Sequence, residues 1–383
     1  MKTLQIGLEW FPERGGGLDR YFYDCVQQLP LAGIDVKGLV AGSERAAQDT
    51  QGQVTAFAPA DSGLINRLTA VRQEFKQVIS ESDYDLVVSH FALYTFPLLN
   101  LLGNRPLVTH FHGPWALESD VEANKSLGVK VKKWFEAKTY GRSQQFIVLS
   151  QTFRQLLHQE YRVPLERITV IPGAVDLERF NVSESPNLAR QKLGWETERP
   201  IMFCIRRLAK RMGLENLVVA MQDVCQQYPD ALLYIGGKGE LAETLQAQIS
   251  QLGLEENIKL LGYIADDDLP LCYRAANFSL VPTVALEGFG LIVIESLAAG
   301  TPVLGTPVGG IPEILRPFNS DLVLASSQPQ DLASGIIEAL GGQRQLPDAA
   351  TCLAYVRHNY TWSVIAPQIE TVYRRAISEK NQP

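Results

Sequence analysis

Short apolar runs alternate with longer stretches of helical periodicity through the first half of the chain. Buried parallel strands are continuously hydrophobic, whereas a helix repeats its apolar positions with a period of about 3.6 residues. The runs predict strands at 4–8, 36–40, 54–57, 84–89, 107–109 and 145–149, with helices at 18–29, 64–79 and 92–102. This alternation predicts a doubly wound, mostly parallel α/β sheet that binds ligands at the carboxyl ends of its strands.

The same alternation resumes after a polar segment at 181–199, which we interpret as a linker. Beyond it the pattern predicts strands at 232–236, 258–261 and 278–282, a buried helix at 291–299 and a last helix at 362–378. A chain of 383 residues is long for one core and suits two domains. We therefore expect domains at 1–185 and 200–362, followed by a terminal helical segment at 363–383.

Composition limits the classes of function. Hydrophobic residues make up 46% of the chain and charged residues 20%, as in ordinary globular proteins. The net charge of −7 argues against a general nucleic-acid binder. The five cysteines show no CxxC spacing, so we interpret them as buried free thiols in a reducing compartment. Glu9 interrupts the apolar N-terminal run, so no export signal is predicted and a cytoplasmic location is expected.

One uncharged run, at 86–103, has the length of a membrane span. His90, Pro97 and Asn100 interrupt it, and it divides naturally into a strand and a helix. We therefore favour strand plus helix over a transmembrane segment.

The segment 285–303 carries the clearest chemistry. A loop, Glu287-Gly288-Phe289-Gly290, leads into an apolar helix that only Glu295 and Ser296 interrupt. Glycines allow backbone N–H groups at a helix start to approach a ligand, and the helix dipole there favours negative charge. An ionised carboxylate in an apolar helix is costly when unpaired, so Glu295 needs a hydroxyl or cation partner.

Cations gather at the start of the second domain. A strand delivers Arg206 and Arg207 at its end, and Lys210 and Arg211 follow before the next helix. Such a cluster suits a diphosphate, because a guanidinium binds two oxygens at once. The alternative is a solvated charge cluster.

The first domain offers a glycine loop and two histidines. Gly15-Gly16-Gly17 follows the first strand, but it is not GxGxxG, which counts against a nicotinamide cofactor. His110 and His112 leave a strand into a Gly-Pro turn, which is a common place for site residues. We disfavour a metal site, because no third ligand follows at a suitable spacing. Structural histidines that fill a turn are the alternative.

The segment 285–303 resembles the motif of two glutamates, eight residues apart, of retaining nucleotide-sugar glycosyltransferases of family 4. Its flanks agree, with Gly-Thr-Pro-Val at 300–303 and VGGIPEIL at 308–315. The resemblance implies the GT-B fold, in which two Rossmann-like domains face each other across a cleft and the C-terminal helix crosses back to the first domain. The donor would lie mainly on the second domain and the acceptor on the first.

The same resemblance implies the site residues. The catalytic set is His112, Glu287, Arg207 and Arg211. Met212 stands where the family has lysine, so Arg211 takes that role, with Lys210 as the alternative. The residues implied to bind the nucleotide sugar are Gly16, Gly17, Arg206, Lys210, Gly237, Tyr263, Ile264, Phe289, Gly290, Leu291 and Glu295. In the family the second glutamate holds the donor ribose and the first holds the transferred sugar.

The resemblance further implies retaining sugar transfer from a nucleotide diphosphate sugar to a hydroxyl of a glycan, a lipid-linked acceptor or a small molecule. No cofactor and no metal are expected. A nucleotide-sugar epimerase and a non-catalytic nucleotide-sugar-binding subunit are the alternatives.

A basic stretch, Lys125–Arg142, stands out from the acidic chain. It places Leu127, Val131, Trp134 and Phe135 on one helical face. Such a helix can lie on an anionic membrane, which would bring the enzyme to a lipid-linked acceptor at the inner face of the membrane. The alternative is an apolar face that packs into its own domain while the lysines are solvated.

Overall fold

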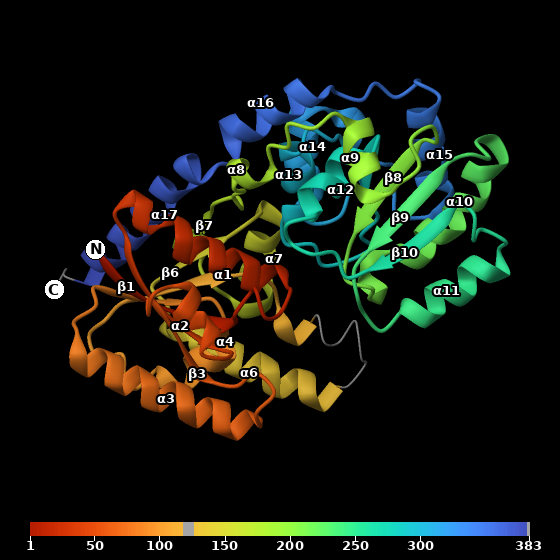
Figure 1. Cartoon of the computed structure of the whole chain (residues 1–383). Coiled ribbons are helices and arrows are strands. Elements are labelled where there is room, and N and C mark those ends of the chain that lie inside the picture. The colour runs from red at the N-terminus through yellow and green to blue at the C-terminus, as the bar shows by residue number, and fades with distance from the viewer. Residues whose placement is uncertain (118–125, 381–383) are drawn as a thin grey trace. The chain divides into compact units, whose positions relative to one another are not determined.

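The computed structural model describes residues 1–117 and 126–380, which form two compact units. The first comprises Met1–Gly173 and Trp362–Pro383, and the second Ala174–Thr361. Both are parallel α/β sheets with helices on their faces (Figure 1). The predicted fold class, GT-B with two Rossmann-like domains, is confirmed at the level of these two units.

The first unit contains a seven-stranded sheet in the order β3-β2-β1-β4-β5-β6-β7. Its strands are β1 Lys2–Glu9, β2 Asp35–Ala41, β3 Val54–Ala58, β4 Leu86–Ser89, β5 Leu107–Phe111, β6 Gln145–Val148 and β7 Ile168–Val170. Its helices are α1 Gly17–Gln28, α2 Arg45–Asp49, α3 Leu64–Glu81, α4 Ala92–Thr95, α6 Ser126–Arg142, α7 Gln151–Tyr161 and α17 Trp362–Lys380. The strand order reverses between β1 and β4, and a ligand site of a parallel sheet lies at such a point.

Strand β1 shows how the two faces differ. Leu4 and Ile6 are fully buried in the core cluster that includes Phe75 of α3. Gly7 faces the opposite way, because successive residues of a strand alternate. A Cβ on Gly7 would lie 3.0 Å from the ring of Phe22 on α1, so glycine lets α1 approach the sheet.

The second unit contains a five-stranded sheet in the order β10-β9-β8-β11-β12. Its strands are β8 Ile201–Ile205, β9 Leu232–Gly236, β10 Ile258–Gly262, β11 Phe278–Val281 and β12 Val303–Gly305. Its helices are α8 Leu177–Phe180, α9 Pro186–Leu193, α10 Leu214–Gln227, α11 Ala242–Gln251, α12 Leu269–Ala275, α13 Leu291–Ala298, α14 Ile311–Phe318, α15 Pro329–Leu340 and α16 Ala349–Asn359. The order reverses between β8 and β11.

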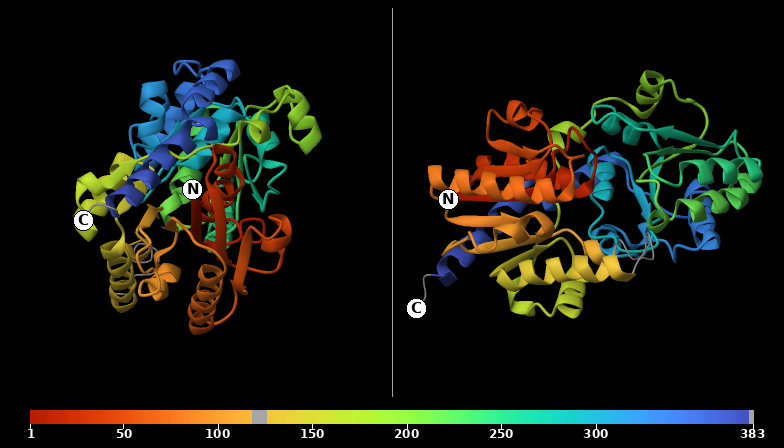
Figure 2. Two further views of the ribbon diagram at one scale, coloured as in Figure 1. Left: turned by 90° about the vertical axis from the view of Figure 1, so that its left-hand side faces the viewer. Right: turned by 90° about the horizontal axis from the view of Figure 1, so that it is seen from below.

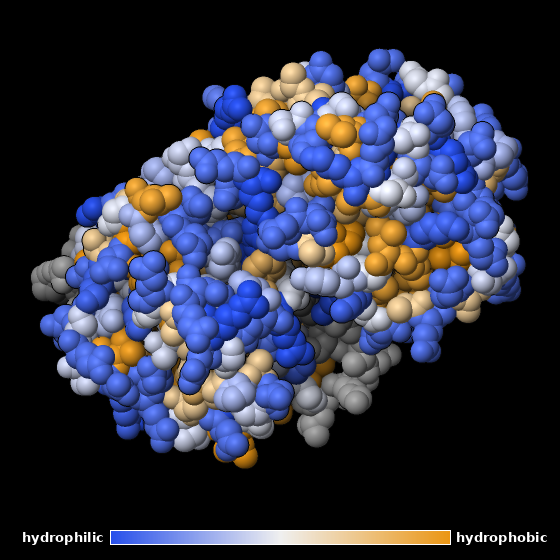
Figure 3. All heavy atoms as spheres, viewed as in Figure 1, coloured by the Kyte–Doolittle hydropathy of each residue, from blue (hydrophilic) through white to orange (hydrophobic). Residues whose placement is uncertain are grey.

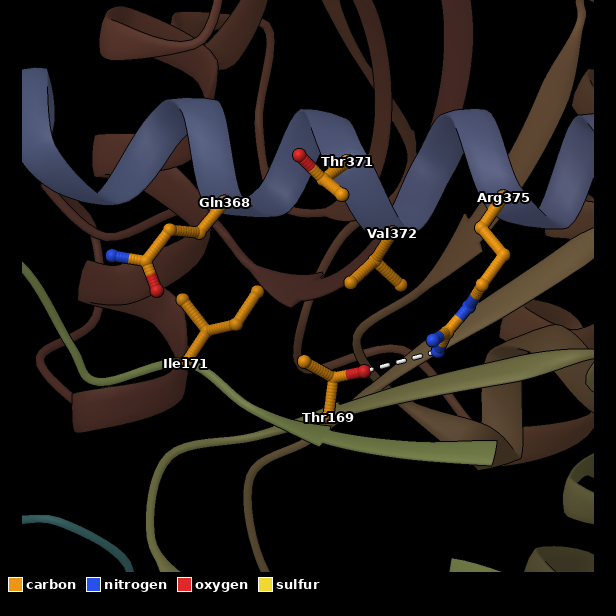
Figure 4. Close-up of a pocket in the computed structure, with 6 residues that line it drawn as sticks. All are labelled: Thr169, Ile171, Gln368, Thr371, Val372 and Arg375. Carbon is orange, nitrogen blue, oxygen red and sulfur yellow. Dashed lines mark hydrogen bonds between the residues drawn. The ribbon is translucent and has the colours of Figure 1, made fainter. Parts of the chain in front are cut away.

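The C-terminal helix α17 packs on the first unit (Figure 2). The Tyr373 hydroxyl lies 2.8 Å from Nε2 of His110 in β5. With β7, α17 lines a pocket of about 220 Å³, where Arg375 donates to Oγ1 of Thr169 at 3.0 Å (Figure 4). This pocket contains none of the predicted site residues.

Two predicted segments differ from the structure. The helix expected at 92–102 is one short turn, α4, followed by a 3₁₀ turn at Phe96–Leu98, since Pro97 cannot continue the α-helical hydrogen bonds. The expected linker at 181–199 contains α9, with Ser185 as its N-cap and Gly194 in the left-handed conformation at its end. Arg190 of α9 is buried and donates to the carbonyl of Ala275 at 2.8 Å. The segment is therefore part of the second unit.

Within the described residues, no helix is long and apolar enough to cross a membrane. On the face shown in Figure 3, hydrophilic residues predominate, and hydrophobic residues gather in several groups, one of them broad and in the right half of the view. Four of the five cysteines are buried and Cys225 is partly buried, all as free thiols.

Candidate functional site

Most of the predicted site residues lie at the carboxyl edge of the second sheet. The strands β8, β9, β10 and β11 end at Ile205, Gly236, Gly262 and Val281, and each is followed by a predicted residue or loop. Because all the strands are parallel, these ends meet at one edge. His112, Gly16 and Gly17 belong instead to the first unit.

A buried ion pair stands at the centre of this edge. Nη2 of Arg206 lies 2.5 Å from Oε2 of Glu287, and the side chains are only 7% and 13% exposed. The same Arg206 nitrogen donates to Oγ1 of Thr283 at 2.5 Å. Burial alone would raise the pKa of Glu287, but the charge and hydrogen bond of Arg206, together with Arg211 and Thr283, outweigh it, so the pKa lies below its ordinary value. Glu287 is thus held as a carboxylate.

Close backbone contacts fix the loop that carries Glu287. Gly309 has φ +57°, and a Cβ there would lie 1.9 Å from the carbonyl oxygen of Glu287. The N–H of Gly310 donates to that same oxygen at 3.0 Å. Leu286 adopts φ +53°, and Nη1 of Arg211 donates to its carbonyl at 3.0 Å. Arg211 therefore supports the loop as well as carrying charge.

Glu295 has the hydroxyl partner that its apolar surroundings predicted. It lies on α13, one turn after Gly290, and the Tyr273 hydroxyl donates to its Oε2 at 3.1 Å. Burial, followed by the charge of Glu295, raises the pKa of Tyr273 well above its ordinary value. Gly290, with φ +95°, caps the helix. Phe289 is buried, with its ring centroid 5.9 Å from that of Tyr360.

The remaining cations are more open. Arg207 and Lys210 are exposed, whereas Met212, at the position of the family lysine, is buried. The structure thus leaves both Lys210 and Arg211 near the strand end, in the 3₁₀ turn Lys210–Met212.

The loops after β9 and β10 carry the other predicted contacts. Gly237 has φ +129°, and a Cβ there would lie 1.9 Å from the carbonyl oxygen of Arg206. Tyr263 is 64% exposed, and Nζ of Lys238 lies 5.0 Å from its ring centroid. Ile264 packs over Gly236, where its Cδ1 lies 2.3 Å from a hypothetical Cβ. An exposed aromatic ring beside a partly buried aliphatic side chain offers a surface on which a flat base can stack.

In the first unit, the glycine loop is shaped by Asp19. Gly16 is the N-cap of α1, and a Cβ there would lie 2.6 Å from Oδ2 of Asp19. The other carboxylate oxygen of Asp19 accepts from the N–H of Glu9 at 2.9 Å. Burial, partly offset by that bond, raises the pKa of Asp19 to about 7. A Cβ on Gly17, in contrast, would meet no atom of the described residues within 4 Å.

His112 belongs to a cluster of three histidines. Nδ1 of His90 lies 3.1 Å from Nε2 of His112, and ligand nitrogens of these two residues and of His110 lie within 4.8 Å of one another. The expectation that His110 and His112 lack a third ligand nearby is therefore wrong. Sequence reasoning missed His90, although it follows the strand 84–89 just as His112 follows its own, and parallel neighbours end together.

The histidine cluster is held neutral by its surroundings. Burial, followed by the neighbouring histidines, lowers the pKa of His90 well below its ordinary value, and burial does the same for His110. Burial lowers the pKa of His112 to about 3. At neutral pH each ring therefore has one N–H donor and one acceptor nitrogen.

Two family models match the chain. Glycosyltransferase Family 4 matches residues 15–179, and Glycosyl transferases group 1 matches residues 187–352. The GDP-mannose-dependent monoacylated alpha-(1-6)-phosphatidylinositol monomannoside mannosyltransferase of Corynebacterium glutamicum is 29% identical over 211 residues, 53% of this chain and 55% of that protein. The chain matches 55% to 60% of the length of the first curated relatives.

Solved structures match over nearly the whole chain. Sucrose-phosphate synthase from Thermosynechococcus elongatus has a TM-score of 0.83 and 21% identity, covering 99% of this chain and 100% of that one. Anabaena HepE in complex with UDP-glucose has a TM-score of 0.79 and 22% identity, covering 98% and 100%. At such identities these matches show the GT-B fold alone.

Replacing Gly309 by alanine should destabilise the protein far more than the same change at Gly342. Both glycines have positive φ, but only Gly309 would place a Cβ against a backbone carbonyl, that of Glu287. We expect Gly309→Ala to lower the free energy of unfolding by about 3 kcal/mol and Gly342→Ala by about 1 kcal/mol. Denaturant titration measures both. Equal losses would show that the contact at Gly309 carries no extra cost.

His110→Phe should make the protein less sensitive to acid. The lowered pKa keeps the His110 ring neutral in the folded protein. As pH falls below the unfolded pKa of 6.5, the unfolded chain therefore binds a proton that the folded protein does not, and stability is lost. Between pH 8 and pH 5 the parent should lose about 2 kcal/mol more free energy of unfolding than His110→Phe. The exposed His358, replaced by glutamine, is the control. A parent and variant with parallel pH curves would contradict the prediction.

Proposed function

Because the chain belongs to glycosyltransferase family 4, we propose that it transfers a sugar from a nucleotide diphosphate sugar to an acceptor hydroxyl, with retention of configuration and without a metal. The observation that carries the proposal is the arrangement of Glu287 and Glu295 around the start of α13, with Arg206 fixing the first and Tyr273 bonding the second. Two carboxylates in different environments suit two different parts of one donor.

The donor contacts follow from these environments. Glu295 is partly buried and ends in carboxylate oxygens that accept from hydroxyls, as the 2′- and 3′-hydroxyls of a ribose require. Arg207, Arg211 and Lys210 supply positive charge for the diphosphate, which becomes more negative as the sugar leaves. These cations do the work that a metal does in other transferases. HepE binds UDP-glucose and the corynebacterial relative uses GDP-mannose, so both are suitable probes.

The structure disfavours the epimerase alternative on chemical grounds. An epimerase needs side chains that take and give protons near the sugar. Glu287 is tied to Arg206 with a lowered pKa, and the pKa of His112 is about 3. Both groups are better suited to binding in one protonation state than to carrying protons. A non-catalytic nucleotide-sugar-binding subunit stays the other alternative, and turnover of a radiolabelled donor distinguishes it.

We infer that helix α6 brings the enzyme to a membrane surface with a lipid-linked acceptor. Val131 and Trp134 are 51% and 50% exposed, although the ring of Trp134 lies 5.2 Å from that of Phe96, whereas Phe135 packs against the core of the unit. Lys130 and Lys138 are exposed beside them. Exposed aromatic and basic side chains on one helix suit an anionic membrane. Lys125 and the side chain of Leu127 lie outside the described part.

Glu295→Ala should weaken nucleotide binding by about 1–3 kcal/mol, because it removes a partly buried hydrogen-bond acceptor. Isothermal titration with UDP, GDP, UDP-glucose and GDP-mannose first identifies the nucleotide that binds the parent. The affinity of the variant for that nucleotide should fall by roughly 5- to 150-fold. Glu243→Ala, an exposed glutamate on α11 of the same unit, is the control. Unchanged affinity in Glu295→Ala would sink the proposed ribose contact.

Sedimentation with vesicles tests the membrane contact. Binding to vesicles rich in anionic lipid should fade with salt and should fall in Lys130→Glu/Lys138→Glu, at about 1 kcal/mol per cation. Lys76→Glu/Lys259→Glu makes the same charge change at other exposed sites and is the control. If the parent fails to sediment at low salt, the membrane contact of α6 is contradicted and a soluble acceptor is favoured.

A further inference from the structure

A line of buried polar groups runs from the backbone of β2 to His112. Oγ1 of Thr3 donates to the carbonyl of Asp35 at 3.0 Å, and Nε2 of Gln5 donates to Oγ1 of Thr3 at 3.2 Å. Oε1 of Gln5 lies 2.9 Å from Nε2 of His90, whose Nδ1 lies 3.1 Å from Nε2 of His112. Thr3 and Gln5 are fully buried, and His90 is 3% exposed.

Local structure accounts for the line. Thr3 and Gln5 are two residues apart in β1, so both point to the same face of the sheet. His90 follows β4, the neighbour of β1, and its N–H donates to the carbonyl of Ile6 at 2.9 Å. The ring of Phe22 lies 5.2 Å from that of His90, and the ring of Tyr21 lies 4.9 Å from that of His112. These aromatic rings help to keep water from the polar groups.

The direction of every proton along this line follows from its first member. A backbone carbonyl only accepts, so the single hydroxyl proton of Thr3 points to Asp35. The Thr3 oxygen must then accept, which turns the NH₂ of Gln5 toward it and the amide oxygen toward His90. His90 therefore carries its proton on Nε2, and its Nδ1 accepts. His112 must donate from Nε2, which leaves Nδ1 as its acceptor.

We propose that Thr3, Gln5 and His90 are positioning residues that hold His112 in the Nε2–H tautomer, so that its Nδ1 accepts a hydrogen bond from a hydroxyl of the transferred sugar. The sugar contact rests on the proposed function, whereas the tautomer does not. The reverse arrangement would place two acceptors, Nε2 of His90 and Oε1 of Gln5, 2.9 Å apart in a buried site, where an unmade hydrogen bond costs about 1–3 kcal/mol.

His110 provides an internal comparison. Its Nε2 meets the hydroxyl of Tyr373, which can donate or accept, and its Nδ1 is buried without a hydrogen-bond partner among the described residues. No one-way acceptor within this part of the chain therefore sets the tautomer of His110. His112, in contrast, is connected to a backbone carbonyl through groups whose protons have only one possible direction.

Long-range ¹H–¹⁵N correlation of the imidazole rings in histidine-labelled protein distinguishes the two tautomers directly. The chain has five histidines, so single substitutions assign the signals. The parent should show His112 protonated at Nε2. In Gln5→Leu, His90 loses the acceptor for its Nε2 proton and gains by moving the proton to Nδ1, which reverses its bond to His112. His112 should then become predominantly Nδ1–H.

Two changes at Thr3 sharpen the test, and neither requires a larger side chain in the core. Thr3→Val removes the hydroxyl that orients the Gln5 amide and should give a mixture of both forms of His112. Thr3→Ser keeps the hydroxyl and should give the parent spectrum. Tyr373→Phe, the control, should alter the His110 signals and leave those of His112 unchanged. A parent His112 protonated at Nδ1, or a Gln5→Leu protein that still shows Nε2–H, would overturn the proposal.

Measurements of turnover distinguish the positioning role of Thr3, Gln5 and His90 from the proposed function. If Nδ1 of His112 accepts from the sugar, Gln5→Leu should lower kcat/KM for the donor by roughly tenfold, and Thr3→Ser should leave it unchanged. If the tautomer of His112 switches as expected while kcat/KM stays the same, the positioning role is supported and the sugar contact of His112 is contradicted.

Discussion

The geometry of the second unit depends on the pairing of Arg206 with Glu287. Two charges removed from water are costly unless each compensates the other, so a 2.5 Å contact between nearly buried side chains leaves the loop little freedom. The loop must hold Glu287 over the end of β8. Because residue 309 is glycine, the backbone there can pass close to the carbonyl of Glu287. Arg211 binds the preceding carbonyl. The same contacts therefore set both the position of Glu287 and its charge.

The first unit also buries an ion pair, Arg20 with Asp24, but around its histidines it buries neutral polar groups. Gln5, His90 and His112 carry no charge at neutral pH and are joined by hydrogen bonds. A neutral network costs less to bury than an unpaired ion, but it must be complete, because every missing partner carries a penalty. This explains why the line of groups ends at a backbone carbonyl.

Sequence patterns predicted the strands of both units well, but they predicted the side-chain contacts of the site poorly. Apolar runs predicted most of the strands within a few residues, since a parallel strand buried on both faces is continuously hydrophobic. The requirement of Glu295 for a hydroxyl was predictable from its apolar neighbours, but Tyr273 was not, because it lies 22 positions earlier on another helix. His90 was missed for the same reason: adjacency of β1, β4 and β5 is a property of strand order. Arg206 was predicted to bind ligand, and the structure shows it bound to Glu287.

The two units should therefore respond to acid in different ranges of pH. The carboxylate of Glu287 has a lowered pKa, so its stabilisation is lost only as pH falls below about 4.5. The histidines of the first unit have lowered pKa values and destabilise the fold below about 6.5. In the same unit Asp19 and Glu136, each with a pKa raised by burial to about 7, act in the opposite sense, because the folded protein takes up their protons first as pH falls. Between pH 7 and pH 4.5 the first unit balances two opposing sets of groups, and a single histidine substitution shifts that balance without touching the charged site of the second unit.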